Sequence, residues 1–178
     1  METDNIEKLE KLENQIKVFL NEKKIDSQLN YCLKQTTFHS AIIIAAKAIN
    51  ENKKIHPHQR KNGRKSLDLF SLEIIKIEEE LNKAVTFDEI FDLICLIKVD
   101  RISKLAFYDT SYRIGCYKNI FPDKIYLHSG TLIGAKRLNL PVKGKNKLDL
   151  SELPIIFKTL NMAPYQIEDF LCHCKDKF

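Results

Sequence analysis

The sequence predicts an all-α fold, a single orthogonal helical domain of about seven or eight helices. Apolar residues recur at three- and four-residue steps through most of the chain, and no segment alternates apolar and polar residues in the sustained way of a strand. A chain of 178 residues with 44% hydrophobic residues can bury one substantial core. We therefore expect one domain, with a helical extension.

The composition narrows the classes of function. The formal net charge of +5 suits a polyanionic partner such as a nucleic acid. Residues 1–13 are highly charged and unlike a signal peptide, and the longest apolar run, 41–46, is far too short to cross a bilayer. Five cysteines without a regular spacing are typical of a reducing compartment. We expect a cytoplasmic protein that has no membrane association and needs no cofactor.

The N-terminal extension is an amphipathic helix, since residues 5–23 place their apolar side chains on one face. We expect residues 1–27 to pack as a helix on a helical domain formed by 28–178. The alternative is an arm that recruits a partner protein. Asp26 offers an N-cap for a largely buried helix over 28–50.

Residues 51–65 form the most basic segment, with six lysines and arginines against one acid. Pro57 and Gly63 predict a loop, which is either a solvated surface or a phosphate-binding segment that uses Arg60 and Arg64. The pair of histidines around Pro57 suits a turn better than a metal site, and we predict no metal.

Two further helices follow the basic segment, over 66–82 and from 87 to about 97. The second begins at a capping box of Thr86 and Glu89. Residues 98–103 are a tight turn before a helix over 104–117, so these two helices form an αα-hairpin.

The rest of the chain is a loop, a short apolar anchor over 125–127, a helix that begins after His128, and two short closing helices. All of the elements from the first helix onward are therefore consistent with the all-α class.

The hairpin resembles that of the helix-hairpin-helix DNA glycosylase superfamily, whose hairpin reads apolar residue, proline, glycine, aliphatic residue and glycine. Residues 99–103 occupy these positions, with Arg101 and Ser103 in place of the two glycines. The resemblance implies DNA binding by this hairpin and the helix after it. Arg101 and Ser103 would hold phosphate by their side chains, together with Lys104.

The family's catalytic segment has its counterpart at 126–131, where His128 occupies the position of the catalytic aspartate. The lysine of bifunctional members aligns with Leu105, one position from Lys104. The cysteine pattern of the iron–sulfur members is missing, since 172–174 holds only a close pair. The resemblance implies a DNA-repair protein that binds duplex DNA or an extruded base, with base excision or another DNA-processing reaction at a non-standard site; RNA is the alternative partner.

The candidate catalytic residues are His128, Asp109 and Tyr108. Asp109 and Arg113 stand four residues apart, so they either pair with each other or act separately, Asp109 orienting His128 or a water and Arg113 binding phosphate. Tyr108 either stacks on an extruded base or packs in the core. Two alternatives stay open: a His128–Asp109 acid–base enzyme acting on a nucleotide or nucleic-acid backbone, and a non-catalytic protein-interaction module.

Overall fold

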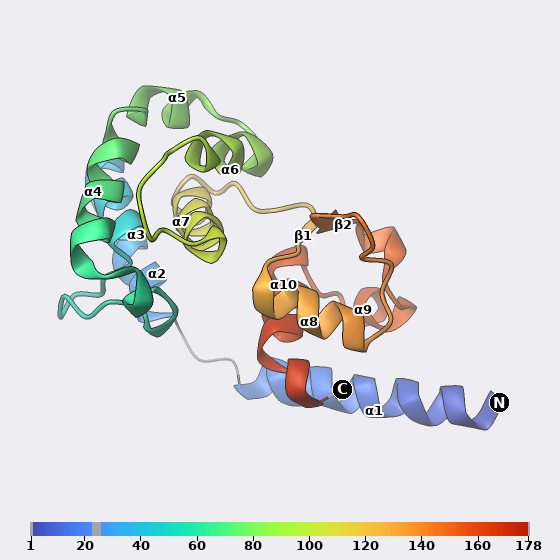
Figure 1. Ribbon diagram of the computed structural model, residues 1–178. Helices are drawn as coiled ribbons and strands as arrows, with labels where there is room; N and C mark the ends of the chain where they lie inside the picture. Colours follow the sequence, from blue (N-terminus) through green and yellow to red (C-terminus); the bar gives the residue numbers. More distant parts are fainter. Residues whose placement is uncertain (1, 23–25, 178) are drawn as a thin grey trace. The chain divides into compact units, whose positions relative to one another are not determined.

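The computed structural model describes residues 2–22 and 26–177. The predicted all-α class is confirmed, because helices make up most of the described chain and its strands are only two residues long. The chain divides into two compact units (Figure 1): unit 1 comprises Met1–Lys24 with Asp123–Phe178, and unit 2 is Ile25–Pro122. None of the described helices has the length and apolar character needed to cross a membrane.

Unit 1 joins the N-terminal helix to the C-terminal third of the chain. The first helix packs its apolar face on the C-terminal helices, with Leu12 and Ile16 buried in one core with Phe157 and Phe170. Phe19 meets Phe170 edge to face, with ring centroids 5.5 Å apart. The elements are α1 (Glu2–Glu22), β1 (Ile125–Tyr126), α8 (Ser129–Arg137), β2 (Lys147–Leu148), the 3₁₀ turn η2 (Leu150–Glu152), α9 (Ile155–Thr159), α10 (Pro164–His173) and the 3₁₀ turn η3 (Lys175–Lys177).

Two glycines let α8 and α10 approach each other closely. A Cβ atom on Gly134 would lie 2.1 Å from the carbonyl oxygen of Leu171, and one on Gly130 would lie 2.4 Å from the Sγ atom of Cys172. Glycine, which carries no Cβ atom, is what permits this contact between the two helices. The start of α8 is therefore fixed against α10.

Unit 2 contains the hairpin and the basic segment. The expected helix over 28–50 is two helices. The first ends at Leu33, and Thr37 caps the second, its side chain accepting a hydrogen bond from Ser40 N. The expected helix over 66–82 is likewise divided. The elements are α2 (Ser27–Leu33), α3 (Phe38–Lys47), the 3₁₀ turn η1 (Pro57–Asn62), α4 (Arg64–Ile75), α5 (Glu78–Lys83), α6 (Phe87–Cys95) and α7 (Lys104–Tyr117).

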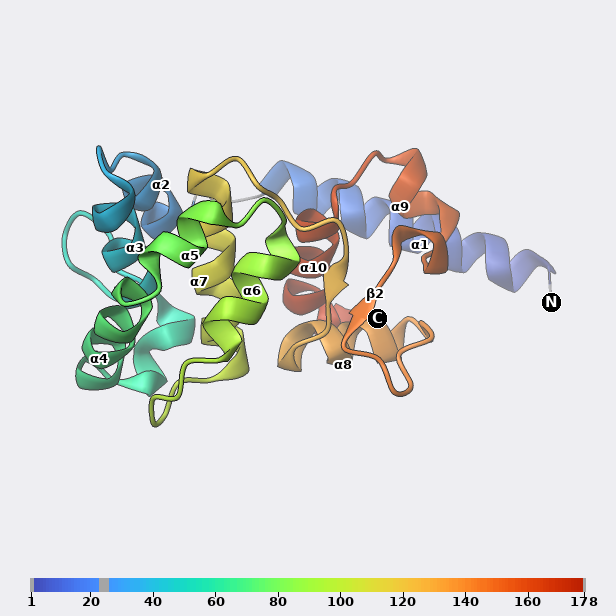
Figure 2. The same ribbon diagram turned by 90° about the horizontal axis from the view of Figure 1, so that it is seen from above.

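The helix α7 lies at the centre of unit 2, against α2, α3 and α6 (Figure 2). Ile42, Phe70, Ile90 and Ile114, from four different helices, are fully buried in one apolar cluster. The predicted capping box at Thr86 and Glu89 is present at the start of α6. This core holds both ends of α7 in place, and with them the side chains considered below.

Candidate functional site

The turn between α6 and α7 has the conformation of a tight hairpin. The N–H of Ile102 donates to the carbonyl oxygen of Val99 at 3.3 Å. Arg101 adopts a φ of 69°, in the left-handed region that favours glycine. Ser103 is the N-cap of α7, and its side chain accepts from Ala106 N at 3.3 Å. Arg101 thus has a backbone conformation in the turn that is more common for glycine.

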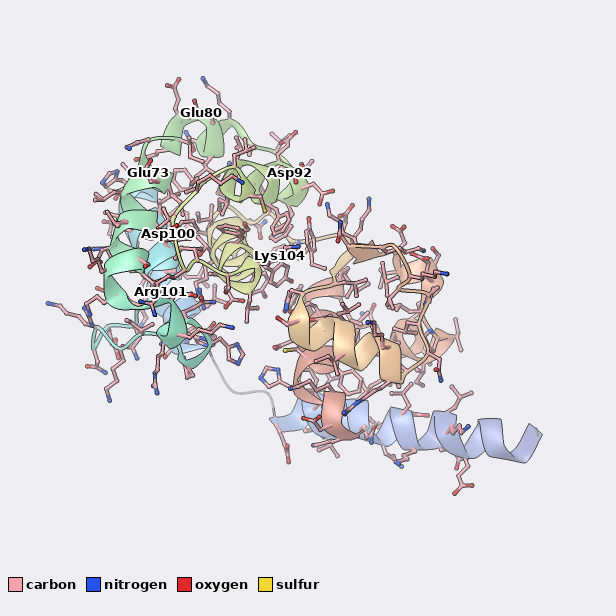
Figure 3. All side chains as sticks on the ribbon, viewed as in Figure 1. Glu73, Glu80, Asp92, Asp100, Arg101 and Lys104 are labelled. Atoms are coloured by element: carbon pink, nitrogen blue, oxygen red, sulfur yellow. The ribbon has the colours of Figure 1, made fainter. Side chains whose placement is uncertain are left out.

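The hairpin buries its apolar side chains and exposes its charged ones. Val99 and Ile102 pack against the core of unit 2, whereas Arg101 and Lys104 are exposed. Figure 3 shows both of them beside the turn, while Glu73 and Glu80 lie toward α5. With Lys98 and Asp100 also exposed, the surface of the turn carries three cationic side chains and one anionic side chain.

The basic segment before α4 is more ordered than a solvated loop. Ile49 and Ile55 form an isolated β-bridge. Arg64 donates from Nη2 to the carbonyl oxygen of Lys53 at 3.3 Å, and Arg60 donates from Nε to that of Ile55 at 3.5 Å. The two arginines stay exposed while they bond to the backbone of their own segment. Their side chains are therefore held at the surface of unit 2.

Polar side chains on η1, within the basic segment, meet Asp109 of α7. Gln59 and Asn62 on η1 are each only 1% exposed. Gln59 donates from Nε2 to the Oδ2 atom of Asp109 at 2.5 Å, and Asn62 donates from Nδ2 to the Oε1 atom of Gln59, also at 2.5 Å. The metal-ligating atoms of His56, His58 and Asp109 all lie within 4.8 Å of one another. We call the group the polar centre; its members are His56, His58, Gln59, Asn62, Asp109 and Arg113.

Arg113 is a buried member of the polar centre. The residue is only 2% exposed. Its Nη2 atom lies 3.6 Å from the Oδ2 atom of Asp26. Its Nε and Nη1 atoms donate to no group in the described part of the chain. Burial, followed by the charge of Arg113, lowers the pKa of His56 and favours its neutral imidazole.

The burial of Arg113 corrects its assignment as a surface contact to nucleic acid. A guanidinium beneath the surface cannot meet a phosphate of bound DNA unless unit 2 opens. Arg113 forms its ion pair with Asp26. The alternative of a pair between Arg113 and Asp109, one turn away on α7, is therefore not observed, and Asp109 accepts a hydrogen bond from Gln59 instead.

Tyr108 is also a core residue. It is 4% exposed, with Phe87 edge to face at 5.9 Å between ring centroids and Tyr112 stacked at 6.3 Å. Both alternatives for this ring were open from its position on the helix. The observed packing leaves no exposed face on which an extruded base could stack.

His128 belongs to unit 1, at the N-cap position of α8. Its Nε2 atom lies 2.5 Å from the Oε1 atom of Glu168 on α10, and the hydroxyl of Thr131 donates to the same oxygen at 2.6 Å. All three side chains are buried. Since Asp109 belongs to unit 2, each of these two candidate catalytic residues has its own partner within its own unit.

The residues that the sequence did not single out are Glu168, Thr131, Gln59 and Asn62. Thr131 had a signal, because it stands three residues after His128 and so shares its side of α8. The other three had none that separates a buried polar side chain from an exposed one. No protein-family model, curated protein or solved structure matches this chain.

Proposed function

We propose that the protein binds DNA through the hairpin between α6 and α7, with the basic segment before α4 as a second contact. The observation that carries the proposal is the backbone of Arg101, whose φ of 69° stands where the hairpin family has a glycine. A conformation that costs a non-glycine residue energy is retained when the surrounding structure requires it. The left-handed backbone of Arg101 therefore supports the resemblance to the family's hairpin.

The chemistry of this surface suits a phosphate group. The first N–H groups of a helix have no acceptor within the helix, and the helix dipole favours an anion beside them. At the start of α7 these groups belong to Ser103, Lys104 and Leu105, next to the exposed charges of Arg101 and Lys104. Backbone and side chains together offer a phosphate both hydrogen bonds and charge.

The basic segment adds cations in the same unit. Arg60 and Arg64 are held at the surface by their bonds to the backbone, so fewer rotamers are lost when they bind. Contacts of this kind are made to phosphates and carry no sequence information directly. We therefore expect binding that depends steeply on salt and weakly on sequence.

We propose binding and not base excision. His128 is 8% exposed and bonded to Glu168, and Tyr108 is packed between aromatic rings. Both side chains are buried, so neither is placed to contact a substrate.

The test is a salt titration of binding to labelled duplex and single-stranded DNA, with RNA of the same sequence as a third probe. The Arg101→Glu, Lys104→Glu double variant should reduce the slope of log K against log salt by about 2, one unit for each lost phosphate contact. The matched control is Lys76→Glu, Lys83→Glu, which changes the net charge equally. Lys76 is the C-cap of α4 and Lys83 ends α5, and both lysines are exposed and paired with glutamates.

Equal loss of binding in the two double variants would mean that only net charge matters, and would refute the hairpin as the contact. Absence of binding by the unmodified protein at low salt would refute DNA binding itself. Tighter binding to RNA than to DNA would refute DNA as the partner and identify RNA as the ligand of the hairpin.

A further inference from the structure

We propose that His56, His58 and Asp109 bind a divalent transition-metal ion, Zn²⁺ or one of similar chemistry, with one coordination position left for water or an anionic oxygen. This site goes beyond DNA binding and does not depend on it. Two imidazoles and a carboxylate are a ligand set that Zn²⁺ takes in proteins, and three protein ligands are the number that leaves a position open.

The three ligands come from two elements that the fold brings together. His56 is the N-cap of η1 and His58 lies within it, while Asp109 lies in the middle of α7. Their ligand atoms are within 4.8 Å of one another, and a tetrahedral ion with bonds of about 2.0 Å needs ligand atoms about 3.3 Å apart. His58 is exposed, so its side chain has room to rotate toward the other two ligands.

The protein already orients the carboxylate. Gln59 holds the Oδ2 atom of Asp109 at 2.5 Å, and Asn62 in turn holds Gln59, with both amides buried. Outer hydrogen bonds of this kind fix the direction of a metal ligand and are a regular part of metal sites. The Oδ1 atom of Asp109 is the oxygen left for the ion.

His56 presents its Nδ1 atom as an acceptor. This atom takes a long hydrogen bond of 3.4 Å from the backbone N–H of His58, a weak contact that an ion bound at Nδ1 would replace.

The charges around the centre favour an anion on the bound ion. The carboxylates of Asp26 and Asp109 balance the charge of Arg113 and leave one negative charge over. A divalent ion would therefore make the local total +1. Arg113 shares its side of α7 with Asp109, four residues earlier, and its Nε and Nη1 atoms donate to no described group. An oxygen anion on the metal would restore neutrality and give these buried donors an acceptor.

The experiment titrates the full-length protein, first stripped with a chelator, with Zn²⁺ by calorimetry and with Co²⁺ by visible absorption. We expect one ion per chain. The affinity should fall by about 10–100-fold or more in both His58→Ala and Asp109→Asn. His39→Ala is the matched control, because His39 is an exposed histidine of the same unit that pairs with Glu78, away from the polar centre.

Cysteine ligation is excluded by repeating the Co²⁺ titration after alkylation of the reactive thiols, which should leave the spectrum unchanged. Far-UV circular dichroism verifies that each variant is folded, and the two variants act on different elements. Unchanged affinity in both variants, equal loss in His39→Ala, or no binding by the unmodified protein would overturn the site. Inorganic phosphate should change the Co²⁺ spectrum, and a spectrum indifferent to phosphate would overturn the open position.

Discussion

Replacing Arg101 by glycine should stabilise the protein. A left-handed backbone costs a non-glycine residue roughly 1–2 kcal/mol, and Arg101 bears that cost at its φ of 69°. Glycine removes it but gives the unfolded chain more freedom, at a cost of about 0.5–1 kcal/mol. The net gain in the free energy of unfolding is about 0.5–1 kcal/mol. Arg101 is exposed, so little packing is lost with its side chain.

Thermal unfolding followed by circular dichroism measures the effect. For a chain of this length, 1 kcal/mol corresponds to about 2–4 °C, so Arg101→Gly should raise Tm by about 1–4 °C. Two controls separate the causes. Arg101→Ala removes the same charge and keeps the strain, so Tm should change little. Asp100→Gly adds chain freedom at a neighbour whose φ is not positive, and should lower Tm.

A Tm of Arg101→Gly at or below that of Arg101→Ala would refute the strain at this position, and with it the observation on which the hairpin assignment rests. The same pair of variants also tells how the hairpin binds phosphate. If the backbone amides bind the phosphate, both variants should keep most of the affinity and most of the salt slope. If the guanidinium is the main contact, both variants should lose affinity together with about one unit of salt slope.

Three further predictions concern the framework of the two units. Gly134→Ala should destabilise unit 1 by about 1–3 kcal/mol in urea unfolding, because the new Cβ atom would meet the carbonyl oxygen of Leu171. The control Lys136→Ala, on the exposed side of α8, should change the free energy of unfolding by less than about 0.5 kcal/mol. Lys118→Met should cost about 2 kcal/mol in the same assay, since its Nζ atom donates to three carbonyl oxygens around the end of α5. Burial raises the pKa of Cys32 from 9.0 to about 12, so this thiol should resist thiol reagents at pH 8 until the protein unfolds. Because the unfolded thiol loses its proton first, the free energy of unfolding should fall as pH rises from about 9 toward 12.

The parts of the fold that sequence predicts well are those set by neighbours in the chain. Asp26 caps α2 and the box of Thr86 and Glu89 caps α6, because these bonds join residues two to four positions apart. The expected helix over 28–50 was wrong in one respect. Apolar periodicity continues across the break, whereas the first helix ends at Leu33 and a new one begins after the N-cap Thr37. Apolar periodicity indicates which face of a helix is buried, but it does not indicate where one helix ends and the next begins.

The polar centre could not be predicted in the same way. Gln59 and Asp109 are 50 residues apart. Gln59 sits in the most basic and polar part of the chain, where exposure is the ordinary expectation. Only the packing of η1 against α7 makes it a buried partner of Asp109. The two histidines beside it drew attention as a pair, but the third ligand that makes them a candidate site comes from another element.

The helix α7 connects the two proposed sites. Lys104 begins it at the hairpin and Asp109 lies five residues later, about 7.5 Å along its axis. A metal ion held by Asp109 and the histidines of η1 would tie α7 to the segment that carries Arg60. Fixing that segment before DNA arrives removes part of the entropy cost of binding, so Zn²⁺ should tighten DNA binding. By linkage DNA must then tighten the binding of Zn²⁺ by the same factor. Asp109→Asn should abolish this coupling and leave the contribution of Lys104 intact, because Lys104 lies at the N-terminus of α7 and is not a ligand of the ion.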